Sequence, residues 1–505
     1  MTVLSLTLAS SPFSYALPST AYKSRASAPL ITTASLSLPR RPELNQDCRR
    51  SIKAMSRDIR SPDPSQVMEL VDESDFEKLV SSEKRISITG FGSLLSERSA
   101  RSTFPDLENF RVAKLQGFRR VFAHAAPIFF ERGIANLETK EISSLSVEPC
   151  EGESLVVTVF EINQTEQQNF LLRMMDLTFA HRFVKVNGIN MHFAEKTPSL
   201  VADYGAFDGA LRPPPVILLL HGFPELWYTW RHQMAALSSL GYRTIAPDLR
   251  GYGDTEAPES ADAYTSLHVV GDLIGLIDEV VGDREKVFVV GHDWGAIIAW
   301  HLCLLRPDRV KALVNMSVVF EPWSLKRKPI SVFKSFYGDD YYICRFQEYG
   351  EIEAEFAKVG TERVLMELLT YRDPGPILLP KGKSYDDPVS LPSWLTEYDV
   401  KYYVSKFEKN GFTGPVNYYR NMDRTWEMMG PFSNAQVKVP VKFIIGDQDL
   451  TYHIPGTKKY IHDGRFKSHV PLLDEVVVIK GGGHFIHEER PDEISKHIHD
   501  YFLTF

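Results

Sequence analysis

The chain has 505 residues, which at about 150 residues per domain allows roughly three domains. Hydrophobic residues make up 43% and charged residues 24%, as in globular proteins, so a wholly disordered chain and a collagen or coiled-coil fibre are excluded. The net charge of −8 gives no positive field for nucleic acid, and no apolar run reaches the roughly 18 residues of a transmembrane segment.

Residues 1–55 are predicted to be a targeting segment rather than part of a folded domain. Between Met1 and Arg41 there is no Asp or Glu, whereas Ser and Thr recur among scattered Lys and Arg. This composition is typical of a transit peptide, chloroplast more than mitochondrial because Ser outweighs Arg, with a disordered Ser-rich tail as the alternative. The expected location is therefore the chloroplast, or the cytoplasm if the protein starts at Met175.

Residues 56–174 are predicted to form a strand-rich segment. Apolar runs at 86–89 and 154–160 indicate strands, and the first leads into a Gly-x-Gly-Ser loop whose exposed amides suit an anionic group. Three stretches in this segment carry a resemblance to the gamma-glutamylcyclotransferase-like family: 91–95 (FGSLL), 117–122 (GFRRVF) and 158–162 (TVFEI). The continuation that bears the catalytic glutamate of that family is absent, because 171–174 runs straight into Met175. We therefore expect an incomplete cyclotransferase-like segment without that activity, left by a gene fusion or by a gene-model join.

After Met175 the pattern changes to that of an α/β protein. Alternating residues at 181–186 and 189–193 flank Asn187-Gly188, which predicts a two-residue β-hairpin. Short buried strands separated by helical patterns then indicate βαβ units and a mostly parallel sheet. The expected strands are 216–220, 244–247, 287–290, 312–314, 441–445 and 476–479.

The alternation of strands and helices lapses between residues 319 and 437, where the sequence is rich in Tyr and Trp and favours helix. We predict a helical cap over 319–437 that interrupts a core formed by 175–318 and 438–505. Such an insertion would lie over the carboxyl ends of the strands, where open α/β sheets bind ligands.

A nucleophile elbow is predicted at 291–295, where a strand enters Gly-His-Asp-Trp-Gly and an apolar helix leaves it. The nucleophile position holds Asp293 and not Ser. A carboxylate attacks a carbon that bears a leaving group and forms an alkyl ester on the enzyme. The sequence therefore predicts displacement chemistry in place of acyl transfer.

The remaining catalytic groups occur in the order expected for an α/β-hydrolase, nucleophile then acid then histidine. The strand at 441–445 leads to Asp449, and the strand at 476–479 leads through three glycines to His484. We expect His484 to activate water for ester hydrolysis while Asp449 orients its ring. Asp447 and His487 are the alternatives, and both are predicted to be solvated loop residues.

The developing oxyanion of ester hydrolysis needs N–H donors. The loop after strand 216–220 reads His-Gly-Phe-Pro-Glu, so the expected donors are the amides of Phe223 and of Trp294, which follows the nucleophile. A cis bond before Pro224 is one way to aim the Phe223 amide.

Displacement by Asp serves epoxides and alkyl halides. Together, 221–224 (HGFP), 291–295 (GHDWG) and 483–485 (GHF) give residues 175–505 a resemblance to the plant soluble epoxide hydrolases, which have an alpha/beta-hydrolase fold. The resemblance assigns two tyrosines, Tyr342 and Tyr419, as donors to the epoxide oxygen, with His221, Pro224 and Trp294 at the substrate. It implies an epoxide hydrolase acting on lipophilic epoxides such as those of fatty acids. Haloalkane dehalogenase and a non-catalytic ligand receptor remain alternatives.

No cofactor or metal is expected for this chemistry. The four cysteines (Cys48, Cys150, Cys303 and Cys344) are widely spaced and form no CxxC pattern, which argues against a zinc site or a disulfide framework. A small lipophilic epoxide is the only partner that the sequence indicates, and it carries no signal for an oligomeric state.

Overall fold

The computed structural model describes residues 58–59, 86–90, 97–104, 106–121, 146–162, 179–198, 213–322 and 328–505. The chain divides into two compact units, Met1–Met174 and Met175–Phe505. The predicted targeting segment, the Gly-x-Gly-Ser loop at 90–93 beyond Gly90, and the junction at 171–175 lie outside the described residues.

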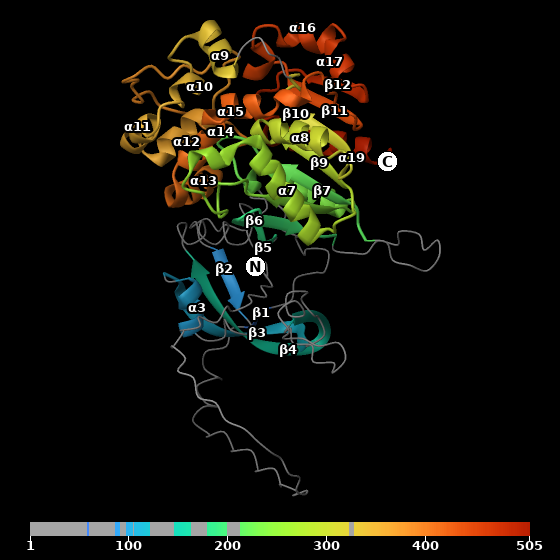
Figure 1. The fold of residues 1–505 in the computed structure, drawn as a ribbon. Helices are drawn as coiled ribbons and strands as arrows, with labels where there is room; N and C mark the ends of the chain where they lie inside the picture. The colour runs from blue at the N-terminus through green and yellow to red at the C-terminus, as the bar shows by residue number, and fades with distance from the viewer. Residues whose placement is uncertain are drawn as a thin grey trace, which may run out of the picture. The chain divides into compact units, whose positions relative to one another are not determined.

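The first unit contains a four-stranded sheet in the order β1-β3-β4-β2 (Figure 1). Its elements are β1 (Asp58–Ile59), β2 (Ile86–Gly90), α3 (Glu97–Thr103), β3 (Glu108–Val121) and β4 (Ser146–Ile162). The two predicted strands are confirmed as β2 and as part of β4. The long strand β3 was not predicted, because polar and basic residues interrupt the alternation on which such a prediction rests.

The second unit begins with the predicted hairpin of β5 (Ala180–Val186) and β6 (Ile189–Lys196). Asn187 and Gly188 both have positive φ, 45° and 82°, as a type I′ turn requires. These strands form one edge of an eight-stranded sheet in the order β12-β11-β10-β9-β7-β8-β6-β5.

The six predicted parallel strands are confirmed. They are β7 (Val216–Leu220), β8 (Arg243–Pro247), β9 (Val287–His292), β10 (Val310–Met316), β11 (Val441–Gly446) and β12 (Leu473–Ile479). Every residue of β7, β9 and β11 is buried, which explains why their sequences are continuous apolar runs.

Helices cover both faces of this sheet. The crossover from β7 to β8 runs in the opposite direction to those from β8 to β9 and from β9 to β10. Right-handed crossovers therefore place α6 (Arg231–Ser239) on one face and α7 (Ser266–Val280) with α8 (Trp294–Leu305) on the other. The carboxyl-terminal helix α19 (Pro491–Phe502) packs against α6. Shorter elements complete the core: η3 (Trp227–Trp230), η4 (Ala261–Tyr264), η6 (Leu450–His453), α16 (Thr457–His462), α17 (Arg465–His469) and α18 (Ile486–Glu489).

The predicted cap is helical and forms a group of its own beside the core (Figure 1). It contains α9 (Pro329–Tyr337), α10 (Tyr342–Arg345), α11 (Glu351–Val359), α12 (Thr361–Leu369), α13 (Glu397–Asn410), α14 (Thr413–Arg420), α15 (Met422–Met428) and η5 (Gly430–Phe432). The chain returns from the cap directly into β11, so the cap is an insertion between two neighbouring strands, β10 and β11.

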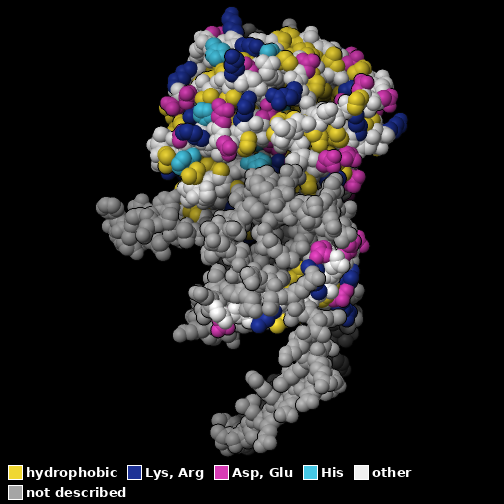
Figure 2. Space-filling view, turned by 180° about the vertical axis from the view of Figure 1, so that it is seen from behind, with side chains coloured by type: hydrophobic (Ala, Val, Ile, Leu, Met, Phe, Trp, Pro, Cys, Tyr) yellow, Lys and Arg dark blue, Asp and Glu magenta, His cyan; other side chains and the backbone are white. Residues whose placement is uncertain are grey.

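Among the described residues, no helix has both the length and the apolar character needed to cross a membrane. On the face of the second unit drawn in Figure 2, basic and acidic side chains are interspersed and do not separate by sign. This distribution agrees with a chain that has no strong positive field.

Candidate active site

Strand register brings four loops of the second unit together at one edge of the sheet. Across neighbouring strands, Leu220 pairs with Gly291, and Met316 pairs with both His292 and Ile444. Gly446 pairs with Ile479 in the same way. Because parallel strands end at the same edge, the loops that follow β7, β9, β11 and β12 converge there.

The elbow after β9 projects Asp293 into this edge. Its backbone adopts φ 49° and ψ −118°, a conformation that a side chain other than glycine rarely adopts. The turn needs small neighbours: a Cβ at Gly222 would lie 2.4 Å from the Cβ of Asp293, and one at Gly295 would lie 2.0 Å from the Leu220 carbonyl oxygen. These close approaches explain the glycines of both motifs.

The Asp293 carboxylate has two different environments. The amide of Phe223 donates to Oδ1 at 2.8 Å, and the Phe223–Pro224 peptide bond is cis. Oδ2 faces the imidazole Nε2 of His484 at 3.7 Å, too far for a direct hydrogen bond. The second expected donor, Trp294, is the first residue of α8, and its indole ring packs edge-on against Tyr419.

His484 is held between the nucleophile and an acid. Its Nδ1 lies 2.9 Å from Oδ1 of Asp449 and 3.1 Å from Oγ of Ser317. Burial alone would lower the pKa of His484, but the carboxylates of Asp449 and Asp293 raise it to about 9. The ring is therefore fixed by its Nδ1 side, with Nε2 directed toward Asp293.

The structure places Asp449, and not Asp447, against His484. Oδ1 of the fully buried Asp449 also accepts hydrogen bonds from the amide and hydroxyl of Thr451, each at 2.9 Å. Burial would raise the pKa of Asp449, but His484, the Thr451 amide and Ser317 hold it below its ordinary value. Asp447 instead accepts a hydrogen bond from the amide of Gly481 in the neighbouring turn.

Tyr342 and Tyr419 come from two cap helices, α10 and α14, and their rings meet with centroids 5.6 Å apart. Burial, together with the nearby charge of Asp293, raises the pKa of Tyr342. Burial and the neighbouring Tyr342 raise the pKa of Tyr419 well above its usual range. Both phenols are thus neutral O–H donors near pH 7.

The neighbouring tyrosines have structural environments. Tyr341 is buried against Tyr337 and Phe333. Tyr418 donates its hydroxyl proton to the Arg250 carbonyl at 2.9 Å.

Asp293, His484 and both tyrosines line one cavity. The other residues that line it are Phe223, Pro224, Leu368, Tyr371, Ile377, Leu450 and Phe485. Apolar side chains therefore form most of its wall, with the polar groups gathered at the nucleophile. A larger and more open hollow lies between α12 and α13, and no residue discussed above lines it.

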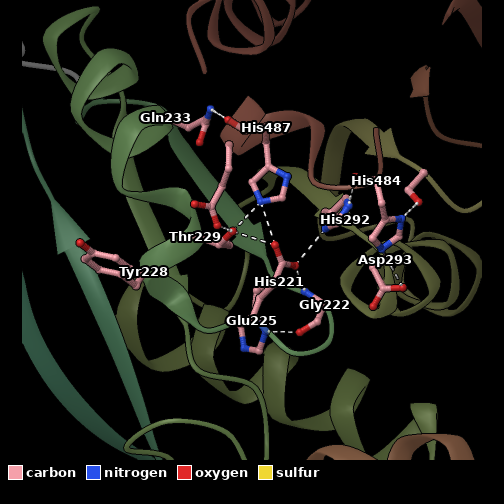
Figure 3. Close-up of polar contacts among 12 residues, drawn as sticks. His221, Gly222, Glu225, Tyr228, Thr229, Gln233, His292, Asp293, His484 and His487 are labelled. Atoms are coloured by element: carbon pink, nitrogen blue, oxygen red, sulfur yellow. Dashed lines mark hydrogen bonds and ion pairs between the residues drawn. The ribbon is translucent and has the colours of Figure 1, made fainter. Parts of the chain in front are cut away.

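A buried network beneath the elbow was missed by the sequence analysis (Figure 3). Glu225 is fully buried and accepts hydrogen bonds from the Gly222 amide at 2.8 Å and from His292 at 2.9 Å. The other ring nitrogen of His292 donates to the carbonyl oxygen of His484 at 2.8 Å. Glu225 thus connects the loop after β7, the elbow and the His484 loop. Its position in the His-Gly-Phe-Pro-Glu motif was the available signal.

His487 was predicted to be solvated, and this prediction is wrong. It is completely buried, and its Nε2 lies 3.1 Å from Oε1 of Glu225 and 2.6 Å from Oγ1 of Thr229. Burial lowers the pKa of His487 to about 4, so the ring is neutral near pH 7. The error arose because α18 turns the chain inward directly after His484.

His221 was expected at the substrate, but its ring is engaged with the backbone. Its Nε2 accepts from the Leu249 amide at 2.9 Å, and its Nδ1 donates to the Gly222 carbonyl at 2.9 Å. The side chain therefore orders the loop after β7. Pro224, expected at the substrate as well, lines the cavity.

Two groups among the described residues have ligand atoms close enough to share a metal ion. They are Glu225 with His292 and His487, and His192 with Asp248 and Asp254. In the first group Glu225 contacts both rings, and in the second Nδ1 of His192 lies 2.7 Å from Asp248. Ion pairs and hydrogen bonds within each group account for its geometry.

Comparison with known proteins bears on the second unit. Residues 215–491 match the alpha/beta hydrolase fold family. Epoxide hydrolase 3 of Siraitia grosvenorii is 54% identical over 328 residues, which cover 64% of this chain and 98% of the relative. Epoxide hydrolase A of Mycobacterium tuberculosis is 35% identical and covers 64% of this chain and 97% of its own length.

Solved structures agree with these relatives. Potato (Solanum tuberosum) epoxide hydrolase I aligns with a TM-score of 0.60 and 54% identity, over 65% of this chain and all of that one. An epoxide hydrolase from Vigna radiata aligns with a TM-score of 0.59 and 51% identity, over 66% of this chain and all of that one. The matches leave the first unit unassigned.

Proposed function

The chain belongs to the alpha/beta hydrolase fold family and is an epoxide hydrolase over its carboxyl-terminal 65%, and on this premise we propose that it opens lipophilic epoxides through an ester of Asp293. The observation that carries the proposal is the placement of a carboxylate, a histidine and two phenols around one largely apolar cavity. Apolar walls favour a lipophilic substrate because its burial removes apolar surface from water.

In the first step a carboxylate oxygen of Asp293 attacks a ring carbon, and the carbon–oxygen bond of the epoxide breaks. Oδ1 is already bonded to the Phe223 amide, so Oδ2 is the free nucleophilic atom. Tyr342 and Tyr419 hydrogen-bond the departing oxygen and supply the proton that makes it a hydroxyl. The product is an alkyl ester with Oδ1 as its carbonyl oxygen.

In the second step His484 takes a proton from water, whose oxygen attacks the carbonyl carbon of the ester. The negative charge that develops on Oδ1 is stabilised by the Phe223 amide, which is already in place, with the Trp294 amide as the expected second donor. Collapse of this intermediate breaks the bond to Oδ2, and the imidazolium returns its proton to the departing alkoxide oxygen, which releases a vicinal diol. The second proton of the water, left on the Asp293 carboxyl group, passes to the tyrosinate formed in the first step and restores the phenol. Asp449 stabilises the imidazolium that forms.

This arrangement favours an epoxide over an alkyl halide. A departing halide needs N–H donors and no proton, whereas two O–H donors, Tyr342 and Tyr419, line the same cavity as the nucleophile. A receptor without turnover would have no use for a general base fixed by a buried acid.

Replacement of two residues tests the mechanism. Asp293→Ala should abolish diol formation, and near-wild-type turnover would overturn the proposal. His484→Gln should still form the ester but hydrolyse it slowly, so the intact protein should gain the mass of one substrate. Release of halide from bromoalkanes at a comparable rate would favour the dehalogenase alternative.

For the first unit we propose an incomplete gamma-glutamylcyclotransferase-like segment without cyclotransferase activity. Support comes from the motifs at 91–95, 117–122 and 158–162 and from the missing continuation beyond 174. Cyclotransferase activity of the purified full chain on a gamma-glutamyl dipeptide would contradict this proposal.

We further propose that residues 1–55 direct the protein to the chloroplast. The absence of acidic residues before Arg41 supports this location. The test is import of the radiolabelled full chain into isolated chloroplasts, with shortening on entry as the expected result. A native protein that begins at Met175 would overturn the proposal and favour the cytoplasm.

A further inference from the structure

The catalytic histidine is carried by the most flexible type of backbone. Three consecutive glycines, Gly481 to Gly483, connect the end of β12 to His484, and Gly481 has a φ of 72°. Glycine loses more conformational freedom on ordering than any other residue, so this turn needs contacts that hold it.

Three side chains contact this turn: Asp447 accepts a hydrogen bond from the Gly481 amide at 2.8 Å, and Glu489 and Arg372 bind the two ends of the turn. The amide of Gly483 donates to Oε2 of Glu489 at 3.0 Å, and Arg372 donates to the Gly481 carbonyl at 3.1 Å. The same nitrogen of Arg372 lies 2.9 Å from Oε2 of Glu489. The two side chains thus form a clamp across the glycine turn.

The two partners belong to different parts of the second unit. Glu489 ends α18 in the core and is 3% exposed, whereas Arg372 lies in the cap between α12 and α13 and is 42% exposed. Residues 371–377 of the same cap segment contact the active site. Tyr371 and Ile377 line the cavity, and the Ile377 carbonyl accepts a hydrogen bond from the Tyr342 amide at 3.0 Å.

We propose that Arg372 and Glu489 are positioning residues for His484, and that the clamp they form makes the placement of the general base depend on the seating of this cap segment. The inference rests on the proposed function. While residues 371–377 are seated as in the structure, Arg372 reaches Gly481 and Glu489 and immobilises the turn. Without the clamp, the turn samples more conformations and His484 spends less time aligned with the ester.

The proposal predicts which step of the reaction changes. Ester formation uses Asp293 and the two tyrosines, whereas ester hydrolysis also needs the Nε2 atom of His484 aligned with water. A partly exposed ion pair contributes little to global stability. Loss of the clamp should therefore slow hydrolysis while leaving ester formation nearly unchanged. The melting temperature should also be nearly unchanged in Arg372 variants, because that side chain is 42% exposed.

The experiment measures both steps in the full chain by rapid quench and intact-protein mass, with trans-stilbene oxide as the probe. In Arg372→Gln and in Glu489→Gln, the hydrolysis rate constant should fall about 10-fold, because small misplacements of reacting groups have effects of this size or larger. The rate constant of ester formation should change less than about twofold. The double variant should be no slower than the slower single variant, because the two side chains act as one unit.

Two further variants serve as controls. Arg372→Lys keeps the charge and should recover part of the hydrolysis rate. Arg465→Gln removes a guanidinium from a surface ion pair with Asp463, outside the cap. It should change the rate constant of neither ester formation nor ester hydrolysis.

The inference would be overturned if the variants lowered the rate constants of ester formation and of ester hydrolysis equally, or lowered neither. If the wild-type chain forms no ester at all, the proposed function fails instead, so the two failures are distinguishable.

Discussion

Ester formation on Asp293 should itself prepare His484 to act as a base. In the resting enzyme the carboxylates of Asp449 and Asp293 raise the pKa of His484 to about 9, so at pH 7 the ring is mostly protonated and cannot accept a proton from water. Alkylation converts the Asp293 carboxylate into a neutral ester. One of the two charges that favour the imidazolium then disappears, and the pKa of His484 must fall.

The size of this fall follows from the distance between the two groups. Unit charges 3.7 Å apart, the separation of His484 Nε2 and Asp293 Oδ2, interact by about 4 kcal/mol at an effective dielectric constant of about 20 and by about 1 kcal/mol in bulk water. One pKa unit corresponds to about 1.4 kcal/mol, so the pKa should fall by about one to three units. Hydrolysis of the ester should therefore have its inflection between about pH 6 and pH 8.

A double-mixing experiment measures this inflection. The ester is formed at one pH, the mixture is moved to pH values from 5.5 to 9.5, and the loss of the substrate mass from the intact protein is followed. The rate constant should rise about tenfold per pH unit below the inflection, because only the neutral ring accepts a proton. In free Asp293→Asn, which is a neutral analogue of the ester, NMR titration of His484 should show a similarly lowered pKa.

A hydrolysis rate constant that is independent of pH over this range would refute the reasoning. An inflection that remains at pH 9 would also refute it, because it would mean that His484 does not sense the charge of Asp293. His484→Gln is the control and should show slow hydrolysis without an inflection in this range.

Three other predictions follow from the same geometry. Tyr342→Phe and Tyr419→Phe should each slow ring opening by about 10²-fold or more in single-turnover measurements, as loss of one oxyanion donor does. Tyr460→Phe is the matched control, because its hydroxyl in α16 donates to the Phe320 carbonyl at 2.8 Å and its ring does not line the cavity, and an equal loss there would contradict the assignment. Glu225→Gln should destabilise the protein by about 3 kcal/mol in urea unfolding at pH 7, because it removes a buried carboxylate that accepts hydrogen bonds from the Gly222 amide and from His292. Burial would raise the pKa of Glu225, but its contacts with His292 and His487 hold that pKa well below its usual value, so the stability from this charge is present above the unfolded pKa and lost as pH falls. The difference between variant and wild type should therefore shrink in acid, and a constant difference would be the contrary result. Gly295→Ala should lower the melting temperature strongly, because its Cβ would lie 2.0 Å from a backbone oxygen at the end of β7, and an unchanged melting temperature would contradict the packing of the elbow.

Much of the second unit could be predicted from the order of the residues. Buried parallel strands are continuous apolar runs, and the Asn187-Gly188 turn has its own backbone preference, so these elements are encoded locally. Asp293, Asp449 and His484 could be predicted to lie together because each follows a strand, and parallel strands end at one edge of the sheet. The choice of epoxide chemistry came from the carboxylate at the elbow together with motifs shared with a known family.

Other features depended on contacts between distant parts of the chain. Glu225, His292 and His487 interact across 67 and more residues, so no local pattern distinguishes a buried histidine from a solvated one. The role of Ser317 beside the catalytic ring depends on the register of β10 against β9 and β11.

The 505 residues allowed roughly three domains, and sequence alone predicted that the hydrolase with its cap occupies the part after Met175 and which groups would perform its chemistry. Backbone conformation and short motifs carry that information, because they depend on neighbouring residues. Only the tertiary structure decided the orientation of His221 into the backbone, the burial of His487 and the contact of Arg372 with the His484 turn. Those features depend on contacts between side chains that are distant in the sequence. The packing of the whole second unit brings those side chains together.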